Sequence, residues 1–187
     1  ALRTTELAKA QLLRAGKIIR RMRELLSLEV RSLGQEGVVS MVEDLGSVLA
    51  MIGAAKGVVV RMDLHRDDDL VRAERIQFQQ AVVNLVRNAV EAVGERPEPD
   101  VVIVGRPLSE TQYQISVEDN GPGIAADQVE RMFQPMTTTK SGGMGLGLSV
   151  TRTIVESHGG RLIVARSVLG GAAFSFNLIR EAVGEHP

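Results

Sequence analysis

Two asparagines in one predicted helix carry side chains suited to binding a metal ion or phosphate. Asn84 and Asn88 lie four residues apart in the segment Phe78–Val93, so in a helix both amides project from one face. An amide oxygen can ligate Mg²⁺, a hard cation that prefers oxygen, without adding negative charge beside phosphates. The alternative is a pair of amides that face solvent or bond neighbouring backbone. Two further motifs in the chain favour the first interpretation.

The first of these motifs is an aspartate followed by a glycine-rich turn, DNGPGI, at the end of a predicted strand. A carboxylate in this position, Asp119, can accept a hydrogen bond from the exocyclic amino group of adenine. Gly121 and Gly123 let the backbone approach the base closely. A plain turn is the alternative, because D-N-G and P-G are both turn sequences. The base-binding hypothesis therefore depends on the presence of the other motifs.

The second motif is GMGLGL, which leads into a helix predicted over Leu146–His158. Amide N–H groups at a helix N-terminus favour phosphate, and this spacing is neither the Walker A nor the dinucleotide pattern. Between the two glycine motifs, MTTTK offers hydroxyls and the cation of Lys140 for a terminal phosphate, the alternative being a solvated loop. The candidate phosphate-binding residues of this motif are Gly143, Gly145, Leu146, Gly147 and Leu148.

A sheet and several helices must bring these motifs together. Helical periodicity predicts a helix over Arg75–Val93, with Val82, Leu85, Ala89 and Val93 on its buried side. Two hairpins are predicted from extended runs separated by turn residues. The hairpins pair Val101–Arg106 with Gln112–Glu118, and Arg161–Ser167 with Ala172–Leu178.

The remaining elements are shorter. The sequence predicts a strand over Gly37–Ser40, a helix over Met41–Ala55, a strand over Val58–Asp63 paired with Leu70–Ala73, and a short helix over Asp127–Met132. Helices that alternate with hairpin-linked strands predict an α+β fold, a two-layer α/β sandwich whose mixed sheet is covered on one face by helices. The charged turn Asp67–Asp69 is expected to be solvated rather than a metal cluster.

The first part of the chain has a different composition from the rest. Residues 1–31 hold eight Lys or Arg against three Glu, although the whole chain of 187 residues has a net charge of −1. Apolar residues follow a heptad seam, which predicts a helix that packs against other helices. The seam consists of Ala8, Leu12, Ala15, Ile19, Met22 and Leu26. Its basic residues are expected on a solvated bundle face, the alternative being a surface that docks an acidic partner. A domain boundary is expected at 33/34, after residues 1–33 and before residues 34–187.

Composition excludes several functional classes. A net charge of −1 gives the chain no overall attraction for nucleic acid, and the absence of cysteine excludes disulfides and cysteine-ligated metals. No apolar run approaches the roughly 20 residues that span a bilayer. A cytoplasmic location is expected for this segment, whether or not the full-length protein is anchored in a membrane.

Together and in this order, the motifs resemble the catalytic ATP-binding domain of sensor histidine kinases, in the GHKL superfamily. NLVRNAVEA resembles the N box, DNGPGI the G1 box, and GMGLGLSVTRTIVESHGG the G2 box with its following helix. The words FQPMTTTK and LLRAGKIIRRMRELL are most similar to the FixL-type and NtrB-type kinases. The implied fold is the Bergerat-type ATP-binding fold, and residues 1–33 resemble the second helix of a dimerisation and phosphotransfer hairpin.

The resemblance implies a role for each matching residue. Asn88 would ligate Mg²⁺, Asn84 would lie beside the phosphates of ATP or ADP, and Asp119 would bind adenine. Phe133–Gly142 would form a lid in which Lys140 contacts phosphate. The intact kinase would transfer the γ-phosphoryl group to a histidine and then to an aspartate of a response regulator. Its partners would be a second copy of itself, the receiver domain of that regulator and an upstream sensor domain.

One departure from the family concerns the histidine that accepts the phosphoryl group. The chain has His65, His158 and His186, and none precedes the predicted ATP-binding domain, so the segment that bears the acceptor is expected to be absent. His158 is expected to cap its helix rather than to act in catalysis. Two alternatives remain: a GHKL-type ATPase or serine kinase, or a dimerisation module that binds nucleotide without turnover. Hydrolysis is disfavoured because Asn84 replaces the N-box glutamate of the ATPases.

Overall fold

The computed structural model describes residues 32–94, 96–133 and 147–180. Its helices are α2 (Val38–Glu43), α3 (Gly46–Ala54), α4 (Arg75–Val93), α5 (Ala126–Met132) and α6 (Gly147–Ser157). Its strands are β1 (Gly34–Gly37), β2 (Val60–Leu64), β3 (Leu70–Ala73), β4 (Val101–Pro107), β5 (Gln112–Asp119), β6 (Ile163–Arg166) and β7 (Ala172–Ile179). Residues 1–31, 95, 134–146 and 181–187 lie outside the described structure, and with them the predicted N-terminal helix.

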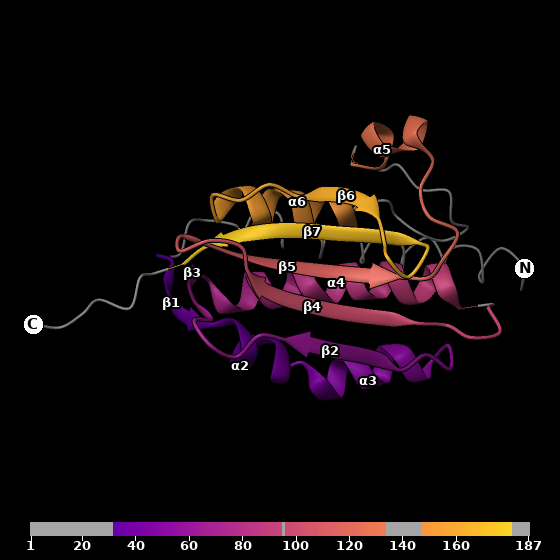
Figure 1. Cartoon of the computed structure of the whole chain (residues 1–187), viewed down its shortest axis with the longest axis horizontal. Helices are drawn as coiled ribbons and strands as arrows, with labels where there is room; N and C mark the ends of the chain where they lie inside the picture. The colour runs from indigo at the N-terminus through magenta and orange to yellow at the C-terminus, as the bar shows by residue number, and fades with distance from the viewer. Residues whose placement is uncertain (1–31, 95, 134–146, 181–187) are drawn as a thin grey trace, which may run out of the picture.

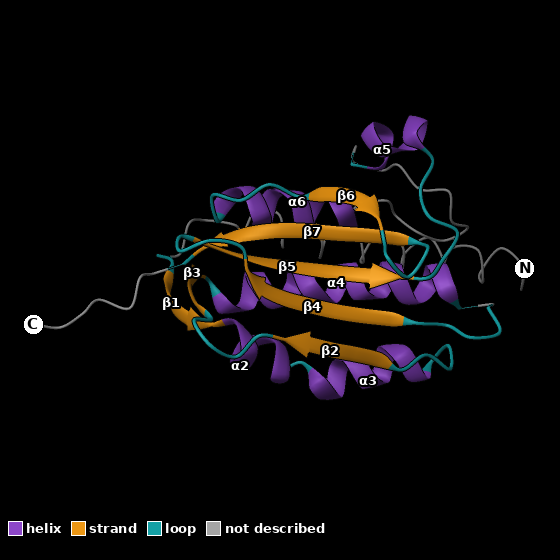
Figure 2. Ribbon diagram, viewed as in Figure 1, coloured by secondary structure: helices purple, strands orange, loops and turns teal. Residues whose placement is uncertain are grey.

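A mixed sheet of five strands forms one layer, and helices form the other. The strand order is β2-β4-β5-β7-β6, with β2 and β4 parallel and the other pairs antiparallel. Figure 1 shows α4 and α6 side by side behind this sheet, and Figure 2 shows the same separation into a strand layer and a helix layer. The predicted α+β sandwich is confirmed.

Strand alternation places the core between the layers. In β5 the side chains of Tyr113, Ile115 and Val117 are buried, and every second residue of β7 is buried in the same way. Phe78 of α4 meets Phe176 of β7 edge to face, with ring centroids 6.1 Å apart. The core cluster joins these residues to the buried face of α4, which includes Val82, Leu85, Ala89 and Val93 as predicted.

Both predicted hairpins and the long helix are confirmed, but three other predictions are wrong. The first strand covers Gly34–Gly37 rather than Gly37–Ser40. The helix predicted over Met41–Ala55 is two helices, since Asp44 and Leu45 form a turn between α2 and α3. β3 pairs with β1 in a separate two-stranded sheet, whereas β2 pairs with β4. Local pattern does not specify which partner a four-residue strand takes.

In the turn before β3, Asp67 and Asp68 are exposed as expected, whereas Asp69 is half-buried and caps a helix. Asp69 accepts hydrogen bonds from two backbone N–H groups at the start of α2, that of Val38 to its carbonyl oxygen at 3.0 Å and that of Val39 to its carboxylate at 2.8 Å. A side chain distant in sequence thus satisfies a helix N-terminus that Gly37 cannot cap. No group of three or more potential acidic, histidine or cysteine metal ligands occurs in the described part of the chain.

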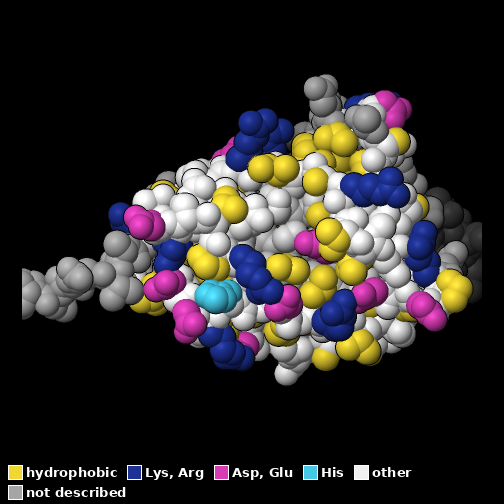
Figure 3. Space-filling model, in the orientation of Figure 1, with side chains coloured by type: hydrophobic (Ala, Val, Ile, Leu, Met, Phe, Trp, Pro, Cys, Tyr) yellow, Lys and Arg dark blue, Asp and Glu magenta, His cyan; other side chains and the backbone are white. Residues whose placement is uncertain are grey.

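The sheet face opposite the helices carries mixed charges. Arg61 makes a bidentate ion pair with Asp100, and Arg106 of β4 pairs with Asp63 of β2. Figure 3 shows basic and acidic side chains interspersed over this side of the molecule, without a large area of one sign. Such a surface agrees with the near-zero net charge and does not favour nucleic acid. Within the described residues, no helix is long and apolar enough to span a bilayer.

Candidate nucleotide-binding site

Helix α4 holds both candidate asparagines on one side of its middle turns. Its N-terminus is capped by Glu74, whose carboxylate accepts hydrogen bonds from the N–H groups of Ile76 and Gln77. The apolar stripe fixes the rotation of the helix against the sheet, and this leaves Asn84 and Asn88 half-buried. Partial burial leaves part of each asparagine accessible to a ligand.

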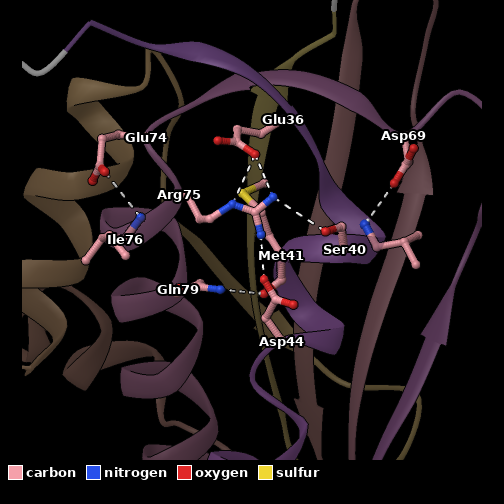
Figure 4. A network of polar contacts seen from close by, with 10 residues as sticks. Glu36, Ser40, Met41, Asp44, Asp69, Glu74, Arg75, Ile76 and Gln79 are labelled. Carbon is pink, nitrogen blue, oxygen red and sulfur yellow. Dashed lines mark hydrogen bonds and ion pairs between the residues drawn. The ribbon is translucent and has the colours of Figure 1, made fainter.

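Arg75, the first residue of α4, ties the start of this helix to the preceding elements. Figure 4 shows its guanidinium between Glu36 of β1 and Asp44 after α2, with nitrogen–oxygen distances of 2.7 and 2.6 Å. Gln79 of α4 donates to the carbonyl of Met41 at 3.0 Å. These contacts fix the start of the asparagine-bearing helix against β1 and α2.

Asp119 is a carboxylate on the buried face of the sheet. It ends β5 two residues after Val117, so alternation turns it toward the helix layer, where only 2% of its surface is exposed. Its Oδ1 accepts hydrogen bonds from the N–H groups of Gly121 at 2.7 Å and Ala172 at 3.1 Å. Its Oδ2 accepts none from the residues that the structure describes. One oxygen therefore orients the group, and the other has no hydrogen-bond donor within the described part of the chain.

The environment of Asp119 opposes its negative charge. Burial raises the pKa of the Asp119 carboxyl above its usual range, although the N–H groups of Ala172 and Gly121 and the charge of Arg96 act in the opposite direction. An ionised carboxylate held in such a place gains from any ligand that donates a hydrogen bond to it. A base with an exocyclic amino group meets that requirement.

Close backbone contacts surround Asp119, and they identify a residue that the sequence prediction did not single out. A Cβ on Gly171 would lie 2.2 Å from Asp119 Oδ1 and 2.4 Å from the nitrogen of Gly121. The N–H of Gly171 also donates to the carbonyl of Asp119 at 3.1 Å. Only glycine fits there, so Gly171 belongs to the site. The available signal was its place directly before β7, the strand paired with β5.

The DNGPGI turn lies against the C-terminal half of α4. A Cβ on Gly121 would lie 3.2 Å from Ala92 Cβ, one helical turn beyond Asn88, and Gly123 has φ +75°. The structure therefore brings the end of β5 close to the asparagine face of α4. Positive φ explains why glycine occupies position 123.

Helix α6 completes the described part of the site. Gly147 is its first residue, Leu148 packs against the core, and the buried hydroxyl of Thr151 donates to the Gly147 carbonyl at 2.9 Å. Ala81 of α4 packs with Val150 and Ile154 of α6. Four candidates, Lys140, Gly143, Gly145 and Leu146, lie outside the described residues.

Packing of the two helices places Asn84 close to the N-terminus of α6. Glu74 at the start of α4 meets His158 just after the end of α6, and Ala81 meets Val150, so the helices are antiparallel. Asn84 is three residues beyond Ala81, and Gly147 is three residues before Val150, about 4.5 Å along each axis. Asn84 of α4 and the N-terminus of α6 at Gly147 therefore lie at the same level along the two antiparallel helix axes.

Of the expected lid, Phe133–Gly142, the structure describes only the first residue, Phe133. It is partly buried against the core, and the guanidinium carbon of Arg152 in α6 lies 5.8 Å from its ring centroid. The rest of the segment Phe133–Gly142 is not described. The chain therefore enters this segment from a point that is fixed against α6.

The donor set suits a hard cation shared with phosphate. Asn84 and Asn88 offer neutral amide oxygens, and the described residues contain no acidic cluster that would bind a metal on its own. Mg²⁺ is commonly held by one or two protein oxygens together with phosphates and water. These residues thus fit a magnesium–nucleotide complex.

Comparison with known proteins agrees with this geometry. A family described as histidine kinase-, DNA gyrase B-, and HSP90-like ATPase matches residues 73–182. Sensor protein FixL of Bradyrhizobium diazoefficiens is 39% identical over 172 residues, covering 91% of this chain and 34% of that protein. Sensory histidine kinase/phosphatase NtrB of Rhizobium leguminosarum bv. phaseoli is 38% identical over 125 residues, covering 60% of this chain and 33% of that protein.

The same relationship appears in the fold. The catalytic domain of histidine kinase ThkA matches with a TM-score of 0.71 and 27% identity, covering 80% of this chain and 97% of that structure. The chain spans about a third of the length of the FixL and NtrB proteins. It belongs to the family of histidine kinase-, DNA gyrase B-, and HSP90-like ATPases, and the matched region is the catalytic domain of a sensor histidine kinase of the FixL and NtrB type.

Proposed function

We propose that this domain binds Mg·ATP and donates its γ-phosphoryl group to a histidine of the intact kinase, from which the group passes to an aspartate of a response regulator. The observation that carries the proposal is the buried Asp119 carboxylate, which has described donors on Oδ1 alone and precedes a turn that lies against α4 near Asn88. Asp119 binds the amino group of adenine in this assignment, and Gly121, Gly123 and Gly171 shape the space for the base.

The phosphates then lie between the amide face of α4 and the start of α6. Asn88 ligates Mg²⁺, Asn84 contacts the phosphates, and backbone N–H groups at Gly147 and Leu148 bind phosphate oxygens. Lys140, Gly143, Gly145 and Leu146 act with them, as the motif suggests. When bound, Mg²⁺ supplies positive charge to the β- and γ-phosphates. The contribution of the chain itself is orientation and charge stabilisation.

The GHKL-type ATPase or serine kinase is the less favoured function. Hydrolysis requires a general base near the γ-phosphate, and position 84 is an asparagine, which cannot take a proton from water at neutral pH. The third function, nucleotide binding without turnover in a dimerisation module, shares every binding residue with the first. Only a phosphotransfer assay separates these two.

The decisive experiment mixes this chain with a separate hairpin that carries an acceptor histidine, and adds γ-labelled ATP. We expect acid-labile label on the hairpin and none on this chain alone, because its histidines are His65, His158 and His186 and none lies in residues 1–31. Free labelled phosphate without labelled hairpin would favour an ATPase. Nucleotide binding without either product would favour the non-catalytic module. The matched control is Asp119→Asn, which should lose labelling with ATP.

The partners of the intact protein follow from the same proposal. Residues 1–33 form the second helix of a hairpin that dimerises with a second copy, and an upstream sensor domain controls it. A response regulator receives the phosphoryl group; histidine kinase ThkA, a structural relative, is known in complex with the response regulator protein TrrA. The domain works in the cytoplasm of a bacterium, the source of the related sensor proteins.

A further inference from the structure

His158 lies just after α6 in a buried position outside the nucleotide-binding residues. Only 2% of its surface is exposed. One imidazole nitrogen lies against the N-cap residue of α4, and the other lies against a carbonyl oxygen of α6. Nε2 lies 3.0 Å from the backbone nitrogen of Glu74, and Nδ1 lies 2.7 Å from the carbonyl oxygen of Ile154. A backbone N–H can only donate, so Nε2 accepts and the proton of the neutral ring is on Nδ1.

The partner of His158 is the N-cap of the asparagine-bearing helix. The carboxylate of Glu74 accepts from the N–H groups of Ile76 and Gln77, while its own backbone N–H is bound by His158. Without this acceptor, the N–H would be left unpaired in a partly buried place. His158 thus joins the end of α6 to the first residue of the α4 cap.

The contact lies at one end of the α4–α6 interface, and the phosphate-binding groups lie at the other. Ala81, Val150 and Ile154 pack between the two ends. Glu74 is ten residues before Asn84, about 15 Å along the axis of a continuous helix. A helix transmits a displacement of its capped end to its middle, and small misplacements of binding groups are costly.

We propose that His158 is a positioning residue: by accepting the Glu74 N–H it sets the placement of α4 along α6, and so aligns Asn84 and Asn88 with the helix N-terminus at Gly147. This role rests on the proposed nucleotide binding by these residues. It differs from the simple helix cap expected from sequence, because its effect appears in ligand affinity as well as in stability.

Two substitutions separate the two hydrogen bonds of the ring. His158→Gln places an amide oxygen where Nε2 lies and keeps an acceptor for Glu74, whereas His158→Asn is too short to reach it but can still donate to Ile154. The control is Tyr113→Phe, which removes the partly buried 2.8 Å hydrogen bond from the Tyr113 hydroxyl to the His65 carbonyl, at the far end of β5 from Asp119. Calorimetry with ADP and Mg²⁺, at a temperature where each variant is folded, gives the affinities.

We expect His158→Asn to weaken ADP binding about fivefold or more, and His158→Gln to bind close to the wild-type level. Tyr113→Phe should lower the melting temperature without changing affinity. In the nucleotide-free chain, the side-chain amide resonances of Asn84 and Asn88 should move in His158→Asn and stay in place in Tyr113→Phe. His158→Leu, which keeps the bulk of the ring, replaces His158→Asn if that variant does not fold.

Three results would overturn the proposal. The first is an acceptor-lacking variant that melts earlier but binds ADP like the wild type, which would make His158 purely structural. The second is a His158→Gln variant as weak as His158→Asn, which would show that the acceptor is not the reason. The third is a wild-type chain that binds no adenine nucleotide; that result refutes the proposed function itself and is seen before any variant is compared.

Discussion

At the scale of single residues, Asp119 combines two requirements that oppose each other. Alternation along β5 turns its carboxylate into the core, and burial raises its pKa, yet the proposed contact with an amino group of adenine needs the ionised form. The protein meets both by giving Oδ1 two backbone N–H donors. Under the proposed function, a ligand that donates a hydrogen bond to Oδ2 recovers part of the stability lost by burying this charge.

Asp119→Asn should bind ATP more weakly than the wild type but should be more stable without nucleotide. The Asn oxygen can accept from Gly121 and Ala172, which leaves an NH₂ group facing the amino group of adenine, and ATP binding should weaken by about 1–3 kcal/mol, roughly 5- to 150-fold. Inosine triphosphate has a carbonyl oxygen in place of that amino group, so its affinity should fall much less between the wild type and Asp119→Asn. Calorimetry with the two nucleotides checks this; an equal loss for both would refute the adenine contact.

The difference in folding stability between Asp119→Asn and the wild type should depend on pH. Because the pKa of Asp119 is raised in the folded state, its favourable contribution is present below the unfolded value near 3.9 and is lost as pH rises through the folded pKa. At pH 7 Asp119→Asn should therefore be more stable than wild type without nucleotide. Urea unfolding at several pH values should show that advantage shrinking as the pH falls; an advantage independent of pH would contradict it.

Asn88→Ala tests the metal ligand. The variant should bind ATP more weakly than wild type in Mg²⁺, because an oxygen ligand is lost, and the difference should largely vanish in EDTA. Calorimetry in both conditions measures the effect. An equal loss in EDTA would assign Asn88 to the nucleotide rather than to the metal. Asn88 lies half-buried on α4, so truncation should leave the fold intact.

Gly171→Ala tests the close packing around Asp119. The new methyl would overlap Asp119 Oδ1 and the Gly121 nitrogen, so the carboxylate must move and both stability and nucleotide affinity should fall, stability by about 1–3 kcal/mol. Gly46→Ala is the matched control, because a Cβ there meets nothing within 4 Å in the first turn of α3. Thermal unfolding and calorimetry report the two effects; equal behaviour of both variants would contradict the packing argument.

At the scale of elements, the sequence predicted what periodicity specifies. The bounds Arg75–Val93 of α4 agree with the prediction because its apolar stripe is long and its end is marked by Gly94. Both hairpins were predictable from turn residues between alternating runs. The pairing of β3 with β1 was not, since it depends on contacts far apart in the sequence, including the Asp69 cap of α2.

For the candidate site, sequence reasoning proposed residues by their type and spacing but could not give their surroundings. The half-buried positions of Asn84 and Asn88 and the inward direction of Asp119 follow from periodicity. Gly171 and His158 contact Asp119 and Glu74, which are distant in the chain. No local pattern reveals such contacts, and a glycine in a hairpin looks the same whether or not a carboxylate lies against it.

Arg75→Met tests whether β1 is held to α4 by charge. Loss of the half-buried pair with Glu36 should cost about 1 kcal/mol and speed hydrogen exchange in β1 more than in the second half of α4. A double-mutant cycle with Glu36→Gln, read by urea unfolding, measures the coupling. The Arg61–Asp100 pair on the exposed sheet face is the control and should couple less. Equal coupling in both pairs would contradict the argument from burial.

At the scale of the whole molecule, the question is where the folded unit begins. The described contacts start with β1, which pairs residue by residue with β3 from Gly34↔Ala73 to Gly37↔Leu70. β3 in turn meets the chain after β7 through the bridge Val71↔Arg180. The small sheet thus connects the first described strand to the last, and a boundary just before Gly34 leaves these contacts whole.

Two truncations on either side of β1 test this boundary. A chain beginning at Ser32 keeps the whole β1–β3 sheet and the Glu36–Arg75 pair, so it should melt and bind ADP as the full chain does. A chain beginning at Val38 loses both, and should melt several degrees lower, since 1 kcal/mol corresponds to about 2–4 °C in a domain of this size. Its ADP affinity should fall less than its stability, because the contacts that hold Asp119 and the buried face of α4 do not involve β1.

Thermal unfolding and calorimetry measure the two effects. A chain from Ser32 that fails to fold would move the boundary into the basic segment, and a chain from Val38 that is as stable as the full chain would move it past β1.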